Sequence, residues 1–216
     1  MRFDRRDVAF GLPLAALALS QGAAHGQEAK PLPKAGATGG MPLMEALTKR
    51  RSQRSFADKP LTPELVSRLL WAAYGLNRPK EGGHTAPSWR GSKEAEVYMA
   101  TAQGVTRYDP ASHGLVDVLK GDIRALTGRS AFAGTAPAVL IYVADLSRMA
   151  KASLDDQKLY AHVNAALIAQ NVYLFAASED LATVMLGNVD KEALAKALKL
   201  RSDQIVTFTQ PIGFPG

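Results

Sequence analysis

The longest regular pattern of hydrophobic positions in the chain lies between residues 155 and 179. Apolar side chains recur there at steps of three and four, and no proline or glycine interrupts them, which is typical of an α-helix. The positions on these steps are Leu159, Val163, Ala166, Leu167, Gln170, Tyr173, Leu174 and Ala177. A helix of about 25 residues would be roughly 37 Å long. We expect it to lie at the centre of the domain or at a subunit interface, with Tyr160 and Tyr173 as packing residues.

Shorter patterns predict the other helices. One short helix is expected to end near Arg50, and another to run through Leu200. A third begins at Thr62, where a capping hydroxyl is followed by a proline and an acid in the first turn. That helix should stop at Gly75 and bury Leu65, Leu69, Leu70 and Ala73.

The strands alternate less regularly. Residues 97–101 and 105–108 are expected to form a hairpin, and further strands are expected over 139–144, 182–186 and 205–212. The stretch 139–144 is almost continuously apolar, so it should be buried on both faces. Because helices and strands mix without strict β–α–β alternation, we predict the α+β class.

The N-terminus has the pattern of an export signal. Three arginines precede an uncharged apolar run of about 12 residues and then small residues up to position 26. This run is shorter than the roughly 20 residues of a membrane helix. We therefore expect residues 1–27 to be a signal that directs the chain out of the cytoplasm to the periplasm. The adjacent Arg5 and Arg6 favour the twin-arginine route, and the Sec route is the alternative. Residues 28–41 are rich in proline and glycine and are expected to be a flexible linker before a domain over 42–216.

Composition limits the chemistry. The 216 residues suit one domain, and the formal net charge of +6 is spread along the chain without a dense basic cluster, so we expect no nucleic-acid partner. No cysteine is present, which excludes disulfides, cysteine nucleophiles and thiolate-bound metals or clusters. His84, His113 and His162 lack metal-ligand spacing and are interpreted as surface or packing residues. Redox chemistry would require a bound organic cofactor.

Three segments hold groups suited to bind a ligand. The first contains Arg50, Arg51, Ser52 and Arg54, and guanidinium groups and hydroxyls bind phosphate well. A solvated basic helix end is the alternative. The second is a polar loop before a strand, with Pro87, Ser88, Trp89 and Gly91, and a plain surface loop is its alternative. The third segment comprises Met185, Leu186 and Gly187. A glycine after a strand would let a flat ligand approach the backbone, and a routine turn is the alternative interpretation.

Together, in this order, the segments resemble the FMN-dependent nitroreductase family, nearest its thiazoline- and oxazoline-oxidase-like branch. The resemblance covers about residues 42–215. Its motifs are Arg-Arg-Ser-x-Arg-x-Phe from Arg50, Thr-Ala-Pro-Ser from Thr85, Ala-Pro-Ala-Val-Leu from Ala136, Gln-Asn-x-Tyr-Leu-x-Ala-Ala from Gln170, Leu-Gly-Asn-Val-Asp from Leu186 and Ile-Gly-Phe-Pro from Ile212.

The resemblance implies a mostly antiparallel sheet flanked by helices and an intertwined homodimer that binds FMN between its subunits. By position, Arg50, Arg51 and Ser52 would meet the phosphate and ribityl chain, and Arg54 the pyrimidine edge. Pro87, Ser88 and neighbouring residues, Trp89 and Gly91 among them, would come from the partner subunit. The backbone of Met185, Leu186 and Gly187 would face the flavin ring.

The implied activity is a ping-pong, two-electron exchange with a small electron-poor or heterocyclic substrate. NAD(P)H or another carrier would supply the electrons, and the protein would bind and orient rather than act as an acid or base. The sequence departs from the family pattern at Gly91 and Lys93, where amides are usual, and it ends soon after the last strand. These departures motivate a second hypothesis, a binding or accessory protein with weak or no flavin binding.

Overall fold

A computed structural model describes residues 28–36 and 38–216. The expected export signal, residues 1–27, lies outside the described residues. Within them, no helix has the length and hydropathy needed to cross a membrane.

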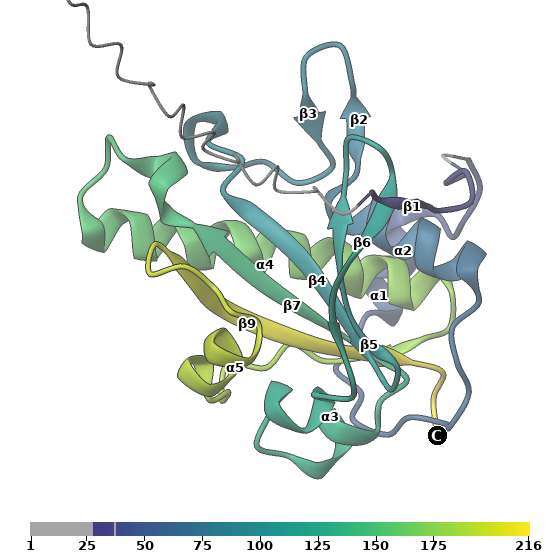
Figure 1. Ribbon diagram of the computed structural model, residues 1–216. Coiled ribbons are helices and arrows are strands. Elements are labelled where there is room, and N and C mark those ends of the chain that lie inside the picture. The colour runs from purple at the N-terminus through teal and green to yellow at the C-terminus, as the bar shows by residue number, and fades with distance from the viewer. Residues whose placement is uncertain (1–27, 37) are drawn as a thin grey trace, which may run out of the picture.

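The centre of the molecule is a seven-stranded sheet in which every neighbouring pair is antiparallel (Figure 1). Its order is β1-β6-β5-β4-β7-β9-β8. The strands are β1 (Lys30–Pro31), β4 (Ala95–Thr101), β5 (Gly104–Asp109), β6 (Gly114–Lys120), β7 (Ala138–Asp145), β8 (Ala182–Thr183) and β9 (Gln204–Gly213). A separate hairpin consists of β2 (Leu76–Arg78) and β3 (Gly83–His84). The predicted α+β class with a mostly antiparallel sheet is confirmed.

Helices cover both faces of this sheet. The α-helices are α1 (Leu43–Lys49), α2 (Pro63–Tyr74), α3 (Ala131–Thr135), α4 (Leu154–Ser178) and α5 (Lys191–Ala197), and the short 3₁₀ helices are η1 (Trp89–Gly91), η2 (Arg124–Thr127) and η3 (Leu146–Met149). Alternate residues of β7 point to opposite faces. Thus Leu140 packs in one core with α2 and α4, whereas Ile141 packs in the other with α5. All eight residues of β7 are buried, as its continuous apolar pattern predicted.

The third predicted helix has the expected ends. The side chain of Thr62 accepts a hydrogen bond from the backbone nitrogen of Leu65, and Gly75 is the C-terminal cap of α2. Leu69, Leu70 and Ala73 are fully buried, whereas Leu65 is only partly buried. The hairpin β4–β5 and the long helix α4 also lie where the pattern predicted them.

The β2–β3 hairpin and α3 were not predicted from the sequence, and three further features differ from the prediction. β6 was not predicted, because its outer half is exposed and its pattern is therefore weak. The strand expected over 182–186 is regular only as β8, and it continues as a single bridge between Leu186 and Thr209. Where a linker was expected, β1 pairs with β6 and the backbone nitrogen of Leu32 donates to the carbonyl oxygen of His113 at 3.0 Å.

Candidate functional site

The arginine-rich segment is extended and lies beside the end of the sheet. α1 ends at Arg50, whose backbone nitrogen donates to the carbonyl oxygen of Ala46. The chain then runs along β8, where the backbone nitrogen of Gln53 donates to the carbonyl oxygen of Thr183 at 3.0 Å. A bridge between Phe56 and Pro215 holds its far end. The segment that follows α1 is thus tied to the sheet by backbone hydrogen bonds.

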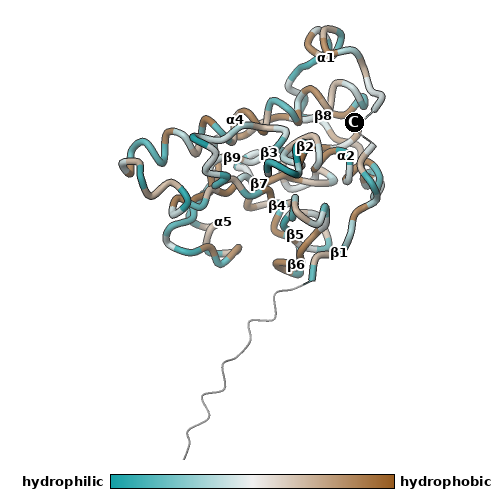
Figure 2. Tube along the Cα trace, turned by 90° about the horizontal axis from the view of Figure 1, so that it is seen from above, coloured by the Kyte–Doolittle hydropathy of each residue, from teal (hydrophilic) through white to brown (hydrophobic). Residues whose placement is uncertain are grey.

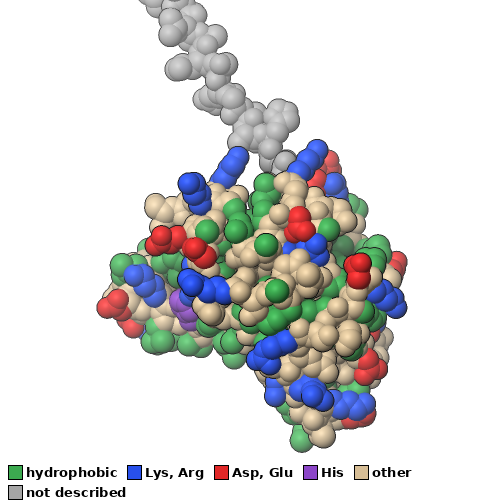
Figure 3. All heavy atoms as spheres, turned by 90° about the horizontal axis from the view of Figure 1, so that it is seen from below, with side chains coloured by type: hydrophobic (Ala, Val, Ile, Leu, Met, Phe, Trp, Pro, Cys, Tyr) green, Lys and Arg blue, Asp and Glu red, His purple; other side chains and the backbone are tan. Residues whose placement is uncertain are grey.

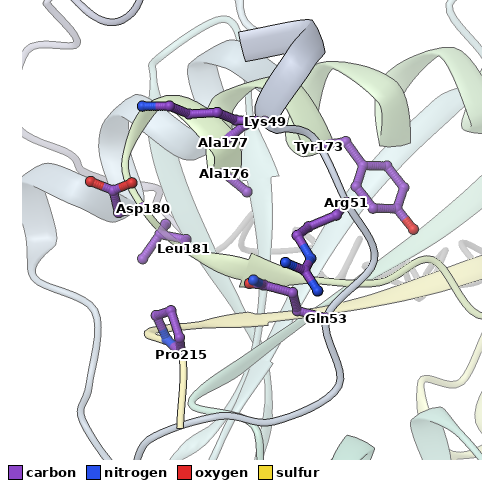
Figure 4. A pocket seen from close by; sticks show the side chains of 9 residues that line it. All are labelled: Lys49, Arg51, Gln53, Tyr173, Ala176, Ala177, Asp180, Leu181 and Pro215. Carbon is purple, nitrogen blue, oxygen red and sulfur yellow. The ribbon is translucent and has the colours of Figure 1, made fainter. Parts of the chain in front are cut away.

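An extended backbone directs alternate side chains to opposite sides. Arg51 and Gln53 line a small hollow of about 130 Å³, together with Lys49, Tyr173 and Asp180. In Figure 4 the side chains of Arg51 and Gln53 lie next to each other, and the hydroxyl of Tyr173 is directed away from Lys49 and Asp180. The hollow that contains Arg51 therefore borders the same tyrosine that Ser52 and Arg50 contact.

Tyr173 joins the first segment to the third. Its hydroxyl lies 3.0 Å from Oγ of Ser52 and accepts a hydrogen bond of 2.8 Å from the backbone nitrogen of Met185. The guanidinium of Arg50 lies 5.3 Å from the centre of the same ring, a distance typical of a cation–π contact. The interpretation of Tyr173 as a packing residue is therefore incomplete, because its hydroxyl connects two segments of the candidate site.

The glycine turn of the third segment is open on its outer side. Gly187 is exposed, and a Cβ atom added there would meet only the ring of Phe208, at 3.6 Å. The preceding Leu186 is held by two backbone hydrogen bonds to Thr209. The backbone at this turn is thus both fixed and accessible, as contact with a flat ligand requires.

The second segment lies on the other side of α4. Nδ2 of Asn171 donates to the carbonyl oxygen of Thr85 at 3.3 Å, and Trp89 packs against Tyr160 with ring centres 5.7 Å apart. Asn171 and Tyr173 are two positions apart, which is about 200° around a helix. Among the described residues, no hydrogen bond joins the loop that contains Pro87, Ser88 and Gly91 to the first or third segment of the same chain.

A buried carboxyl group fixes this loop to α4. Glu94 is 0% exposed and accepts hydrogen bonds of 2.6 Å from both Nδ2 of Asn164 and Oγ of Ser92. Oγ of Ser88 accepts from the backbone nitrogen of Lys93 at 3.0 Å. The residue pattern gave no sign of this supporting role of Glu94, since a glutamate next to a polar loop is normally expected at the surface.

Lys93 is directed away from the first and third segments. Its ammonium lies against Gly82 of the β2–β3 hairpin and lines a crevice of about 250 Å³ with His84. The imidazole of His84 stacks on Tyr74 with ring centres 4.1 Å apart. Burial lowers the pKa of His84, although a hydrogen bond to the carbonyl oxygen of Tyr74 partly opposes this. Lys93, which stands where the family has an amide, thus lines this crevice.

Between the two sides of α4 runs a stripe of exposed apolar side chains. Leu159, Val163 and Leu167 are 57%, 44% and 41% exposed and lie at steps of four residues, on one face of the helix. The opposite face is buried in the domain. Figure 2 shows that hydrophobic positions recur along the whole length of α4 and that α1 lies at one end of the molecule. On α1, Leu43 and Met44 are also exposed. We refer to Leu159, Val163 and Leu167 as the α4 stripe.

On the face shown in Figure 3, Lys and Arg side chains are distributed over several places, with acidic side chains between them. Within residues 28–36 and 38–216, no group of three or more histidine and acidic side chains is arranged to hold a metal ion.

Comparison with known proteins places this arrangement in a family. Residues 47–214 match the model of the nitroreductase family. A nitroreductase-family protein of Methanocaldococcus jannaschii is 32% identical over 181 residues, which are 79% of this chain and 90% of that protein. A crystal structure of a nitroreductase-family protein from Ralstonia eutropha has a TM-score of 0.82 at 36% identity, with 88% of this chain and 95% of that chain covered.

A more distant structure shares the fold. The NADPH:FMN oxidoreductase of Vibrio harveyi has a TM-score of 0.60 at 21% identity, and the match covers 80% of this chain and 68% of that one. The order of the motifs, the antiparallel sheet with its long helix and the matches at more than 30% identity agree. The chain belongs to the nitroreductase family.

Proposed function

We propose that the protein is an FMN-dependent oxidoreductase that transfers two electrons to or from a small electron-poor or heterocyclic substrate. The observation that carries this proposal is the contact of Ser52 and Met185 with the same hydroxyl of Tyr173, which sets the arginine segment beside the open turn at Gly187. The family, and the similar fold of the NADPH:FMN oxidoreductase of Vibrio harveyi, support it. From the sequence motifs we further propose that the chain is nearest the thiazoline- and oxazoline-oxidase-like branch.

The donor set on the Tyr173 side fits the phosphate of a flavin nucleotide. Arg50 and Arg54 form no salt bridge with a carboxylate among the described residues, so Arg50 is available for the phosphate and Arg54 for the flavin ring. Ser52 adds a hydroxyl. Each charge-assisted hydrogen bond of this kind contributes about 1.5–3 kcal/mol when water is partly excluded.

When bound, the cofactor supplies hydride chemistry that no side chain of this chain can provide. The residues of the chain bind and orient it. Arg50 and Ser52 would hold the anionic end, the backbone from Met185 to Gly187 would face the ring, and Arg54 would place a positive charge where negative charge develops on reduction.

We propose that the cleft is completed by a second copy of the chain. The α4 stripe separates the two halves of the candidate site, with Tyr173 on one flank and the Trp89 loop on the other. If two copies pack their stripes together about a twofold axis that runs along α4, the loop of each copy is brought to the Tyr173 side of the other. This arrangement would bury apolar side chains that are otherwise exposed and would supply Pro87, Ser88, Trp89 and Gly91 from the partner.

Flavin content tests the proposal. The chain without residues 1–27, purified after expression in the cytoplasm, should be yellow or become so with added FMN. Replacement of Arg50 and Arg54 by alanine should lower the affinity for FMN at least tenfold, whereas Arg78→Ala, which removes an exposed arginine of β2, should not change it. Equal affinities in all three proteins would contradict the assignment of the phosphate clamp.

A second candidate function is a binding or accessory protein that does not use flavin. It is favoured by one observation: Lys93, at a position where the family has an amide, is directed into the His84 crevice instead. A colourless protein that cannot be reconstituted with FMN would support this candidate.

Export to the periplasm by the twin-arginine or the Sec route remains a proposal that follows from residues 1–27. The same holds for NAD(P)H or another carrier as electron donor. Fusion of residues 1–30 to a reporter that requires export, compared with a variant in which Arg5 and Arg6 are lysines, would distinguish the two routes.

A further inference from the structure

Lys191 and His162 form a hydrogen-bonded pair beside the Gly187 turn. Lys191 is the first residue of α5, and its Nζ lies 3.1 Å from Nε2 of His162 on α4. Nδ1 of His162 lies 2.7 Å from the carbonyl oxygen of Lys158. Because a carbonyl oxygen can only accept, Nδ1 holds the proton and Nε2 offers its lone pair to the lysine. In this tautomer the imidazole orients the amine of Lys191.

Phe208 connects this pair to the open turn. Its ring meets that of His162 edge-on, with centres 5.3 Å apart, and Nζ of Lys191 lies 5.8 Å from the ring centre. The same ring is the neighbour of Gly187. His162 and Tyr173 are eleven positions apart, about three turns of helix, so both lie on the same flank of α4. The pair therefore lies farther along the surface on which the candidate cleft is built.

The surroundings of Lys191 suit proton donation. Partial burial lowers the pKa of Lys191, and no carboxylate among the described residues offsets this effect. His162 takes only one of the three N–H groups of the ammonium, so two remain for a ligand. An ammonium that is partly desolvated gives up a proton more readily than one in water.

We propose that Lys191, oriented by His162, donates a proton to an electron acceptor whose oxygen becomes basic on reduction. The inference rests on the proposed function. A para-quinone becomes a hydroquinone by gaining one hydride and one proton. The hydride brings both electrons and comes from the reduced cofactor. The proton comes from Nζ of Lys191, where an N–H bond breaks as an O–H bond forms, and the neutral amine then regains a proton from water.

Two oxidants with different proton demands test this role. The flavin-loaded protein is reduced without oxygen and then mixed rapidly with either para-benzoquinone or ferricyanide, which takes single electrons and no proton. In Lys191→Met the reaction with quinone should slow about 100-fold and lose the decline at alkaline pH that the wild-type protein shows. The reaction with ferricyanide should keep its wild-type rate. Lys196→Met, an exposed lysine of the same helix, should behave as wild type with both oxidants.

A measurement without turnover accompanies these rates. The nitrogen NMR signal of the Lys191 side chain in the oxidised protein should titrate below those of the other lysines, and it should move in His162→Phe. If Lys191→Met leaves the quinone reaction unchanged, or slows both reactions equally, the proposal is overturned, since equal slowing indicates a structural role. A wild-type protein that binds no flavin would overturn the proposed function as well, and this is seen from the absorption spectrum before any rate is measured.

Discussion

At the scale of single residues, the hydroxyl of Tyr173 has the largest consequence for the candidate site. It accepts the backbone hydrogen bond of Met185 and contacts Ser52, so two segments that are 133 positions apart share one oxygen atom. Removal of this atom leaves the ring and its packing in place. The hydroxyl therefore acts on the relative position of the two segments more than on stability.

Tyr173→Phe should weaken FMN binding about fivefold, because the loss of one neutral hydrogen bond costs about 1 kcal/mol. Tyr160→Phe is the matched control, since no hydrogen bond of its hydroxyl occurs among the described residues. Titration of the flavin-free protein with FMN, followed by the quenching of flavin fluorescence, gives both affinities. An unchanged affinity in Tyr173→Phe would contradict the role of this hydroxyl.

The buried carboxyl group of Glu94 gives a second prediction at this scale. Asn164→Ala removes one of its two hydrogen-bond donors at a fully buried position. Loss of a donor to a buried charged group costs about 1.5–3 kcal/mol, so the Tm should fall by roughly 4–10 °C for a chain of this size. Asn188→Ala, at an exposed position, should change the Tm by less than about 2 °C. Thermal unfolding followed by circular dichroism measures both.

Residue types predicted part of the site, for a physical reason. Arginines and hydroxyls at Arg50, Ser52 and Arg54 are visible in sequence because phosphate binding needs those groups. The roles of Tyr173 and Glu94 were not visible, because they depend on which side of α4 or of β4 each side chain occupies. Likewise His162 and Lys191 are 29 positions apart, and only the packing of α5 against α4 brings them together.

At the scale of elements, α4 combines two faces that its sequence pattern did not separate. Apolar residues occur on all sides of the helix, so the three- and four-residue steps predicted its length without showing which positions are buried. The structure buries small residues such as Ala161, Ala165 and Ala169 against the sheet and leaves the larger Leu159 and Leu167 exposed. Small side chains allow close approach to the sheet, and the larger ones remain available for another surface.

Val163 lies in the middle of the α4 stripe, and Val163→Asp should prevent association of two copies. A carboxylate buried without a partner costs several kcal/mol, which is enough to dissociate a dimer at micromolar concentration. The variant should sediment as a monomer and lose FMN at the same time. Val118→Asp, on exposed β6, introduces the same charge away from the stripe and should remain as associated as wild type. A dimeric Val163→Asp protein with full flavin content would contradict the proposed interface.

Edge elements were the least predictable part of the fold. β1 has only two residues, one of them a proline, and its pairing with β6 depends on backbone atoms rather than on a hydrophobic pattern. Oγ of Ser67 is fully buried and donates to the carbonyl oxygen of Pro33, which also lies near the imidazole of His113. These contacts join α2 to two connecting segments that are distant in sequence, and periodicity along the chain cannot indicate them.

At the scale of the whole molecule, the central question is whether one chain or two form the cleft. The two halves of the candidate site lie on opposite flanks of α4 in a single chain, and a twofold axis through the stripe would bring them together. If the cleft is shared, two variants that are each altered in a different half of the cleft can regain FMN binding when they form a mixed dimer. A cleft within one chain does not allow this.

Mixed dimers should therefore recover flavin binding. One variant has Arg50→Ala and Arg54→Ala, and the other has Pro87→Glu, which places a carboxylate in the second segment. Each should bind little FMN alone. In a mixed dimer one cleft receives both intact halves and the other receives both damaged halves, so random exchange of subunits at equal amounts restores about a quarter of the sites. FMN bound per chain after mild unfolding and joint refolding measures this fraction. Recovery close to zero, in a sample whose mass shows mixed dimers, would show that each chain forms its cleft alone.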